Sequence, residues 1–148
     1  MIRPITAVLL LALGVGRGNA QAPSEAMEAA KRLMADVVAC FNQADVKCMM
    51  AFYTADAIDI DTDGSVAKGK SAIEQHAAQA FAGPFKGAKA TATVGSARMI
   101  RPDVMVFEGV FEFSQPGQAA QRLIYIGTAT RTQGRWLVEA AMGAVPTK

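Results

Sequence analysis

Asp59 and Asp61 stand two residues apart in the segment AIDIDTDG, and their carboxyl groups have the chemistry for acid–base work. Because side chains in a strand alternate between its two faces, both carboxyl groups project from the same face. In an apolar cavity, desolvation raises the pKa of such a group, and repulsion between the two charges leaves one of them protonated. A carboxylate in this setting can take a proton from a carbon next to a carbonyl group.

The same alternation leaves two orientations of this segment open. If Ile58 and Ile60 face the core, as ordinary hydrophobic patterning favours, both aspartates point to water. If the aspartates face a cavity, the two isoleucines lie on the outer face. A period of two permits only one of these arrangements.

His76 is the only histidine of the chain, and it lies in the segment KSAIEQHAAQAF. It follows Ile73 by three residues and precedes Ala80 by four, which places it on the apolar stripe of a helix. Two roles are open: a hydrogen-bonded histidine at the edge of the core, or an acid, base or donor lining a pocket. With no second histidine and no clustered thiolates, the sequence predicts neither a metal site nor a cofactor.

Two cysteines, Cys40 and Cys48, flank the segment FNQADVK, which reads as a turn between two helices. In an oxidising compartment they can form a disulfide, which over so short a loop would stabilise the fold by about 2.5 kcal/mol. The alternative is a pair of buried free thiols that behave as small apolar side chains.

The first twenty residues have the features of a signal peptide. Arg3 supplies a positive start, the apolar run ITAVLLLALGV follows, and Gly18-Asn19-Ala20 places small residues at a cleavage site. The run of about eleven residues is shorter than the roughly twenty that a membrane span needs. The sequence therefore predicts cleavage of residues 1–20, a mature domain at 21–148, and a periplasmic or secreted location without a membrane anchor.

The charge balance gives no reason to expect a polyanionic partner. The full chain has 15 basic and 13 acidic residues, and removing Arg3 and Arg17 with the signal peptide leaves 13 of each. A net charge near zero excludes an electrostatic case for nucleic acid or an anionic membrane surface.

Helical periodicity comes first in the mature chain. Apolar residues recur every three or four positions over 24–42, Asp45 can cap a short helix reaching about Tyr53, and Gly69 opens a helix that ends at Gly83-Pro84. One early strand, 57–61, lies between the second and third helices.

Four more strands follow, at 88–99, 104–113, 123–130 and 136–142. In the second of these, Met105, Phe107, Phe111 and Phe113 share one face, and Glu108 and Glu112 share the other. We therefore expect an α+β domain in which an antiparallel sheet curls around helices, with a ligand cavity at its open end.

Several short motifs occur in a characteristic order. These are Asn42-x-x-Asp45, Tyr53-x-x-Asp56-Ala57, Gly69-Lys70, Phe81-Ala82-Gly83-Pro84, Pro102-Asp103-Val104 and Gly134-Arg135-Trp136. With these motifs, residues 30–146 resemble the SnoaL-like group, of the SgcJ/EcaC type, in the nuclear transport factor 2-like superfamily.

The resemblance implies a cone-shaped, cystatin-like roll. Three N-terminal helices would pack on a strongly curved, mainly antiparallel sheet that encloses a pocket. Members of the group often form homodimers through this sheet. Some members of the superfamily are isomerases, cyclases or dehydratases, whereas others bind ligands or serve as assembly modules. The fold therefore does not settle the activity.

The resemblance also assigns candidate residues. Counted from Asn42, the catalytic base of the superfamily's steroid isomerases falls on Asp61. Their helix-borne tyrosine falls on Val37, and their second acid falls near Ile126 or Gly127. Val37, Ile126 and Gly127 have no side-chain group that can donate a proton to an enolate oxygen, which argues against steroid isomerisation by that machinery.

The expected pocket wall is largely apolar and aromatic. Tyr53, Tyr125 and Trp136 carry polar groups and can equally lie in the core or at the rim. The predicted lining consists of Val37, Phe41, Tyr53, Phe107, Phe111, Tyr125, Trp136 and Met142.

Three functions follow from these expectations. The first is an exported homodimeric pocket protein that binds a small, largely apolar or carbonyl-bearing molecule. The second is an isomerase, cyclase or dehydratase that uses Asp61, Asp59 or His76. The third is a homodimeric interaction module without a ligand.

Overall fold

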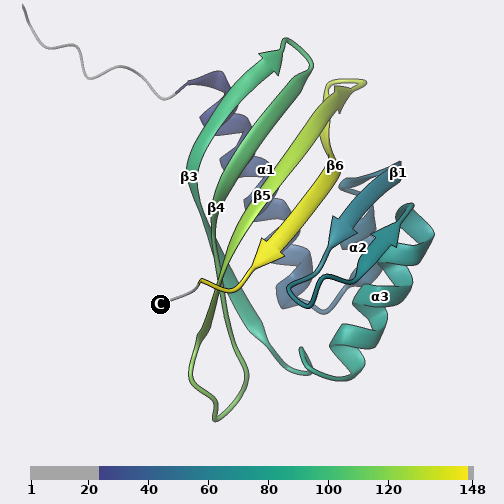
Figure 1. The fold of residues 1–148 in the computed structure, drawn as a ribbon, viewed down its shortest axis with the longest axis vertical. Helices are drawn as coiled ribbons and strands as arrows, with labels where there is room; N and C mark the ends of the chain where they lie inside the picture. The colour runs from purple at the N-terminus through teal and green to yellow at the C-terminus, as the bar shows by residue number, and fades with distance from the viewer. Residues whose placement is uncertain (1–23, 147–148) are drawn as a thin grey trace, which may run out of the picture.

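The computed structural model describes residues 24–146, and the predicted signal peptide at 1–20 lies outside them. Three helices and six strands make up this part of the chain, and Figure 1 shows their arrangement. The elements are α1 (Glu25–Asn42), α2 (Val46–Met50), β1 (Tyr53–Ile60), β2 (Val66–Lys68), α3 (Lys70–Ala82), β3 (Lys89–Arg101), β4 (Val104–Ser114), β5 (Gln121–Thr132) and β6 (Arg135–Ala144).

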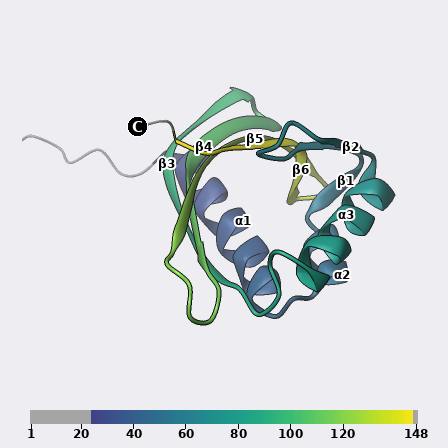
Figure 2. The same ribbon diagram turned by 60° about the horizontal axis from the view of Figure 1, so that its bottom comes forward.

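The strands form a single sheet in the order β2-β1-β6-β5-β4-β3. Strand β1 runs parallel to β6, and every other neighbouring pair is antiparallel. All three helices lie on the concave side of the curved sheet (Figure 2). Helix α1 packs mainly on β3, and α3 packs on β1 and β2. The expected α+β architecture, with helices packed on a curled and mostly antiparallel sheet, is confirmed.

Helix α1 begins at a polar cap and packs along one apolar stripe. The Ser24 side chain accepts a hydrogen bond from the Met27 N–H at 3.2 Å, which satisfies one of the free amides of the first turn. The buried positions Ala30, Leu33 and Val37 recur at helical spacing. This stripe holds the helix against the sheet, mainly on β3.

The corner between α1 and α2 explains the Asn42-x-x-Asp45 motif. The Asn42 amide donates to the Ala90 carbonyl at 3.0 Å and accepts from the Ala90 N–H at 2.7 Å, so it pairs with the start of β3 as a strand would. Asp45 caps α2 by accepting the Cys48 N–H at 2.9 Å. The predicted disulfide is confirmed, since Cys40 and Cys48 are bonded across this corner.

The second helix and the first strand differ from the prediction. Helix α2 ends at Met50, and β1 starts at Tyr53, where the chain was expected to be still helical. The reason is tertiary, because the Phe52 carbonyl accepts the Val138 N–H at 2.7 Å and thereby joins β1 to β6.

Strand β2 was not expected at all. It follows a tight turn at 61–65, in which Gly64 adopts a positive φ of 85°, and it pairs with the end of β1. Three residues are too few to give a periodic signal in the sequence.

The core lies between the helices and the concave face of the sheet. Met105, Phe107 and Phe113 of β4 are buried there, whereas Glu112 on the other face is exposed, as the alternation of this strand predicts. Within residues 24–146, no helix has the length and apolar character needed to cross a membrane.

Candidate functional site

A cavity of about 230 Å³ opens between the helices and the concave face of the sheet. All three helices and strands β1, β4, β5 and β6 contribute to its wall. Most of the wall is apolar, and its size is in the range of a small organic ligand.

Four of the five phenylalanines in this wall form one aromatic cluster. The ring of Phe41 on α1 lies 5.0 Å from Phe81, 5.6 Å from Phe85 and 5.3 Å from Phe111, measured between ring centroids. Their tilted and edge-to-face arrangements are the favourable ones for aromatic pairs. These rings give the cavity an apolar surface contributed by α1, α3, the turn after α3 and β4.

The structure has the orientation of β1 in which the aspartates face inward. Asp59 lines the cavity and pairs in register with Ala141 of β6, another lining residue. Ile58 lies on the outer face and is 38% exposed. Because β1 ends at Ile60, Asp61 is free of the strand alternation, and both Ile60 and Asp61 reach the cavity.

Asp59 is the more enclosed of the two carboxyl groups. It accepts a long hydrogen bond, 3.5 Å, from the hydroxyl of Tyr53, which is itself buried. Burial raises the pKa of Asp59, and the nearby charge of Asp61 raises it further, while His76 and the Tyr53 hydroxyl lower it. Burial, followed by the charge of Asp59, also raises the pKa of Tyr53.

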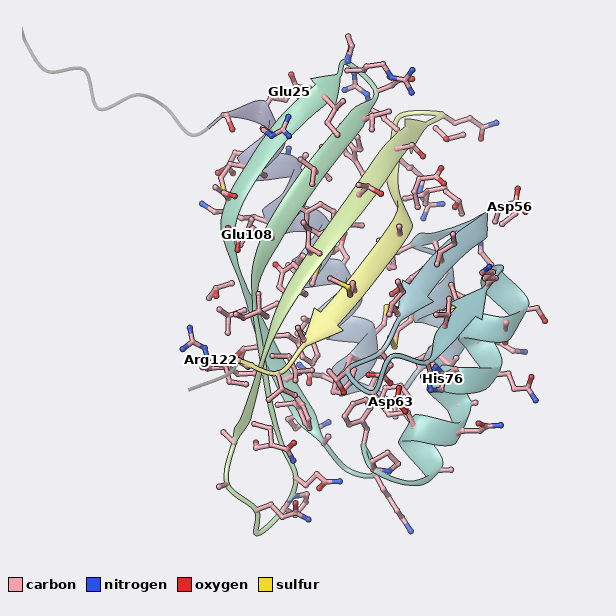
Figure 3. The ribbon with its side chains drawn as sticks, in the orientation of Figure 1. Glu25, Asp56, Asp63, His76, Glu108 and Arg122 are labelled. Carbon is pink, nitrogen blue, oxygen red and sulfur yellow. A yellow bond between two sulfur atoms is a disulfide. The ribbon has the colours of Figure 1, made fainter. Side chains whose placement is uncertain are left out.

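Asp61 and His76 form a second polar pair, near the surface. His76 Nε2 lies 3.7 Å from Asp61 Oδ2, and the two side chains are 41% and 43% exposed. His76 lies close to the turn that carries Asp63, whereas Asp56, in the middle of β1, lies away from both (Figure 3). The hydrogen bond from the Ser65 N–H lowers the pKa of Asp63.

The hydroxyl of Tyr125 is committed to the backbone. The hydroxyl donates to the Thr93 carbonyl at 3.1 Å. It lies so close to Gly109 that a Cβ atom on this glycine would be 2.7 Å from the hydroxyl oxygen. Burial raises the pKa of Tyr125 to about 12, with a further contribution from Glu108. Tyr125 therefore offers its ring to the cavity.

Most of the residues predicted for the pocket wall come together at the cavity. Lining residues include Val37, Phe41, Tyr53, Phe107, Phe111, Tyr125 and Met142, as well as Asp59, Asp61 and His76.

Trp136 is the exception, because it does not line the cavity. It pairs in register with Arg131 near the β5–β6 turn, and the Arg131 guanidinium lies 5.5 Å from its ring centroid. The pocket prediction for Trp136 is corrected accordingly.

Helix α3 contributes more to the wall than the prediction assigned to it. Ala77, Ala80 and Phe81 line the cavity beside His76. Their positions continue the apolar stripe from Ile73 at spacings of three and four, and this signal could have identified them.

Val37, Ile126 and Gly127 all line the cavity, so the positions where the resemblance places a tyrosine and a second acid carry no acidic group. Gly127 is held small by packing, since a Cβ atom there would lie 2.8 Å from Phe107 Cζ. In the described part of the chain, no three His, Cys, Asp or Glu side chains gather as a metal site would require.

These features define a class: an α+β domain whose curved sheet and helices enclose a ligand-sized cavity. Neither a protein-family model nor a curated protein matches the sequence. Solved structures do match. A domain of unknown function with a cystatin-like fold from Nostoc punctiforme has a TM-score of 0.75 and 19% identity, with 85% of this chain and 81% of that chain covered.

Two further solved structures share this fold. An NTF-2 like protein of unknown function from Shewanella oneidensis has a TM-score of 0.67 and 15% identity, covering 79% of this chain and 97% of that one. A ketosteroid isomerase-like protein from Erwinia carotovora has a TM-score of 0.66 and 13% identity, covering 82% and 97%. The chain therefore has the cystatin-like fold, which it shares with solved NTF-2 like and ketosteroid isomerase-like proteins.

Proposed function

We propose that this protein binds a small, largely apolar molecule in the cavity between its helices and its sheet. The observation that carries the proposal is the cavity itself, about 230 Å³ with an aromatic wall and two polar pairs, Tyr53–Asp59 and Asp61–His76. Apolar surface supplies the affinity of such sites, and a few polar groups orient the ligand.

Cavity-filling variants test this proposal. Ala77 of α3 lines the cavity, whereas its neighbour Ala78 is exposed, so the substitutions Ala77→Leu and Ala78→Leu add the same volume in different places. The probe is prodan, a neutral naphthalene ketone whose fluorescence shifts in apolar surroundings. We expect saturable binding to the native protein and at least about tenfold weaker binding to Ala77→Leu, because filling a pocket excludes the ligand.

Ala78→Leu is the matched control and should bind prodan as the native protein does. Equal loss in both variants, or no saturable binding by the native protein, would contradict the proposal. Thermal unfolding of each variant checks that the fold is intact.

A second candidate function is proton abstraction from a carbon next to a carbonyl group. Asp61 Oδ2 would take the proton, His76 lies 3.7 Å from that oxygen, and a protonated Asp59 would donate a hydrogen bond to the enolate oxygen. In D₂O the carbon would recover a deuteron from solvent, which NMR follows directly for benzylacetone. We expect Asp61→Asn to lower the exchange rate by about a hundredfold, and exchange no faster than in buffer excludes this function.

We also propose that the protein is exported after cleavage behind Ala20. The Cys40–Cys48 disulfide supports this, because such bonds persist in oxidising compartments. Intact mass spectrometry of the full chain expressed in a bacterium tests it. The expected product begins at Gln21, and a product that retains residues 1–20 contradicts the proposal.

A homodimer through the outer face of the sheet completes the proposal. Ile58, Val66 and Ile124 point away from the helices and are 38%, 51% and 45% exposed, and such apolar patches mark interaction surfaces. We expect the double variant Ile58→Lys, Ile124→Lys to sediment as a monomer. Ile100→Lys, at an exposed position of β3, is the control that keeps the dimer, and a native protein that sediments as a monomer overturns the proposal.

A further inference from the structure

The charged groups of the cavity wall are uneven in sign. Asp59 and Asp61 line it with His76, and no lysine or arginine is among its lining residues. When both carboxyl groups are ionised the wall carries two negative charges, and the imidazole of His76 can offset only one of them. The site therefore repels carboxylate and phosphate ligands.

We infer that the ligand is a small organic cation, a protonated amine with an apolar body, whose ammonium group binds at Asp59. This inference rests on the proposed function and names the chemical class of its ligand.

Asp59 is the first argument, because its largely enclosed carboxyl group forms no salt bridge with any of the described residues, and the only cationic group that acts on its charge is the more distant His76. The salt bridges among residues 24–146 pair Asp61 with His76 and do not include Asp59. Its side-chain partner is the Tyr53 hydroxyl at 3.5 Å, the outer limit of a hydrogen bond. A charge removed from water is costly unless it is paired, and a bound cation would supply the missing partner.

The second argument is the inventory of donors and acceptors. The two tyrosine hydroxyls of the wall already donate, Tyr53 to Asp59 and Tyr125 to the Thr93 carbonyl. The carboxylate oxygens accept, and they outnumber the donors that remain free. A ligand that donates several hydrogen bonds fits this arrangement, and an ammonium group has three N–H donors and no acceptor.

The third argument is the position of the aromatic wall. Phe41 and Phe111 belong to the same cavity as Asp59, so the apolar body of the ligand has a surface to pack on. Ring faces also attract cations that come within about 6 Å of a centroid. An amine carried on an apolar skeleton satisfies both parts of the site.

Three ligands with one carbon skeleton separate the possibilities: benzylacetone, the alcohol formed by reducing it, and the primary amine that replaces its oxygen. Isothermal titration calorimetry near neutral pH and at low ionic strength gives their dissociation constants. We expect the amine to bind at least about tenfold more tightly than the ketone and the alcohol, since its hydrogen bonds to carboxylate are charge-assisted.

Asp59→Asn should remove the preference for the amine, whereas Asp56→Asn, at an exposed position of the same strand, should keep it. If Asp59→Asn does not fold, salt titration of the native protein replaces it. The dissociation constant of the amine should then rise between about 10 and about 500 mM NaCl while that of the alcohol stays constant.

The outcomes distinguish this inference from the proposed function. A ketone or alcohol that binds as tightly as the amine overturns the cation preference and leaves the pocket proposal in place. The same holds if prodan binds and none of the three compounds does. Failure of prodan and of all three compounds overturns both proposals.

Discussion

The Tyr53 hydroxyl reaches the Asp59 carboxylate at 3.5 Å although the two residues are six positions apart on one strand. In a straight strand their Cα atoms would lie about 20 Å apart, too far for these side chains to meet. The register of β1 against β6 explains the contact, because Tyr53 faces Val138 and Ile58 faces Ala140. Five steps along β1 therefore match two along β6, and the resulting bulge brings the two side chains together.

Removing the Tyr53 hydroxyl should shift the titration of Asp59. The hydrogen bond favours the ionised carboxylate, so Tyr53→Phe is expected to raise the pKa of Asp59 above its already raised value. The loss of stability should be about 1 kcal/mol, the usual net contribution of one hydrogen bond. Carboxyl carbon NMR during a pH titration measures the shift, and an unchanged or lowered pKa would contradict the contact.

Asp59→Asn should change how stability depends on pH. Burial raises the pKa of Asp59 above the value of 3.8 for a free carboxyl group. The contribution of the protonated form to stability is therefore complete below that value and is lost as the pH rises through the folded-state pKa. The free energy of unfolding of Asp59→Asn, relative to the native protein, should increase as the pH rises from below 3.8 through the folded-state pKa of Asp59.

Denaturant unfolding at several pH values measures this difference. Asp56→Asn, an exposed substitution on the same strand, serves as the control. A relative stability of Asp59→Asn that falls with pH would show that Asp59 is stabilised in its ionised form.

Gly109→Ala should destabilise the fold strongly. A Cβ atom at this position would lie 1.9 Å from the Thr93 carbonyl oxygen and 2.7 Å from the Tyr125 hydroxyl, so the backbone of β3 would have to move. Overpacking of this kind costs about 3 kcal/mol. Gly143→Ala is the control, because its nearest neighbour would be Thr62 Cγ2 at 3.5 Å, an ordinary contact. Equal unfolding midpoints for the two variants would refute the close approach.

Reduction of the Cys40–Cys48 disulfide should lower stability by about 2.5 kcal/mol. It should also weaken prodan binding, because Met49 and Met50 line the cavity from the helix that this bond fixes to α1. Urea unfolding with and without reductant measures the loss. The stability of the double variant Cys40→Ala, Cys48→Ala should not change with reductant. If the stability of the native protein does not change either, the disulfide does not stabilise the fold.

The pattern of apolar residues along the sequence predicted most of the helices and strands. The stripe through Leu33 and Val37 predicted α1, and the alternation from Met105 to Phe113 predicted β4 and its buried face. These elements repeat over three or more turns or pleats, so the pattern outweighs any single residue. Strand β2 and the early start of β1 were missed because pairing with a distant strand decides them.

What the sequence determined by itself is the order of all elements except β2, the disulfide-competent pair of cysteines, and the presence of two closely spaced carboxyl groups at the end of the first strand. Which side of β1 faces the cavity was decided only in the folded molecule. Burying Ile58 would have satisfied hydrophobic patterning, yet Ala57, which is fully buried, and Asp59 face inward. The outer face of the sheet also carries exposed apolar side chains, such as Ile58, Val66 and Ile124. Alternation alone therefore did not show which side of β1 faces the core, and the packing of α3 against β1 decided it.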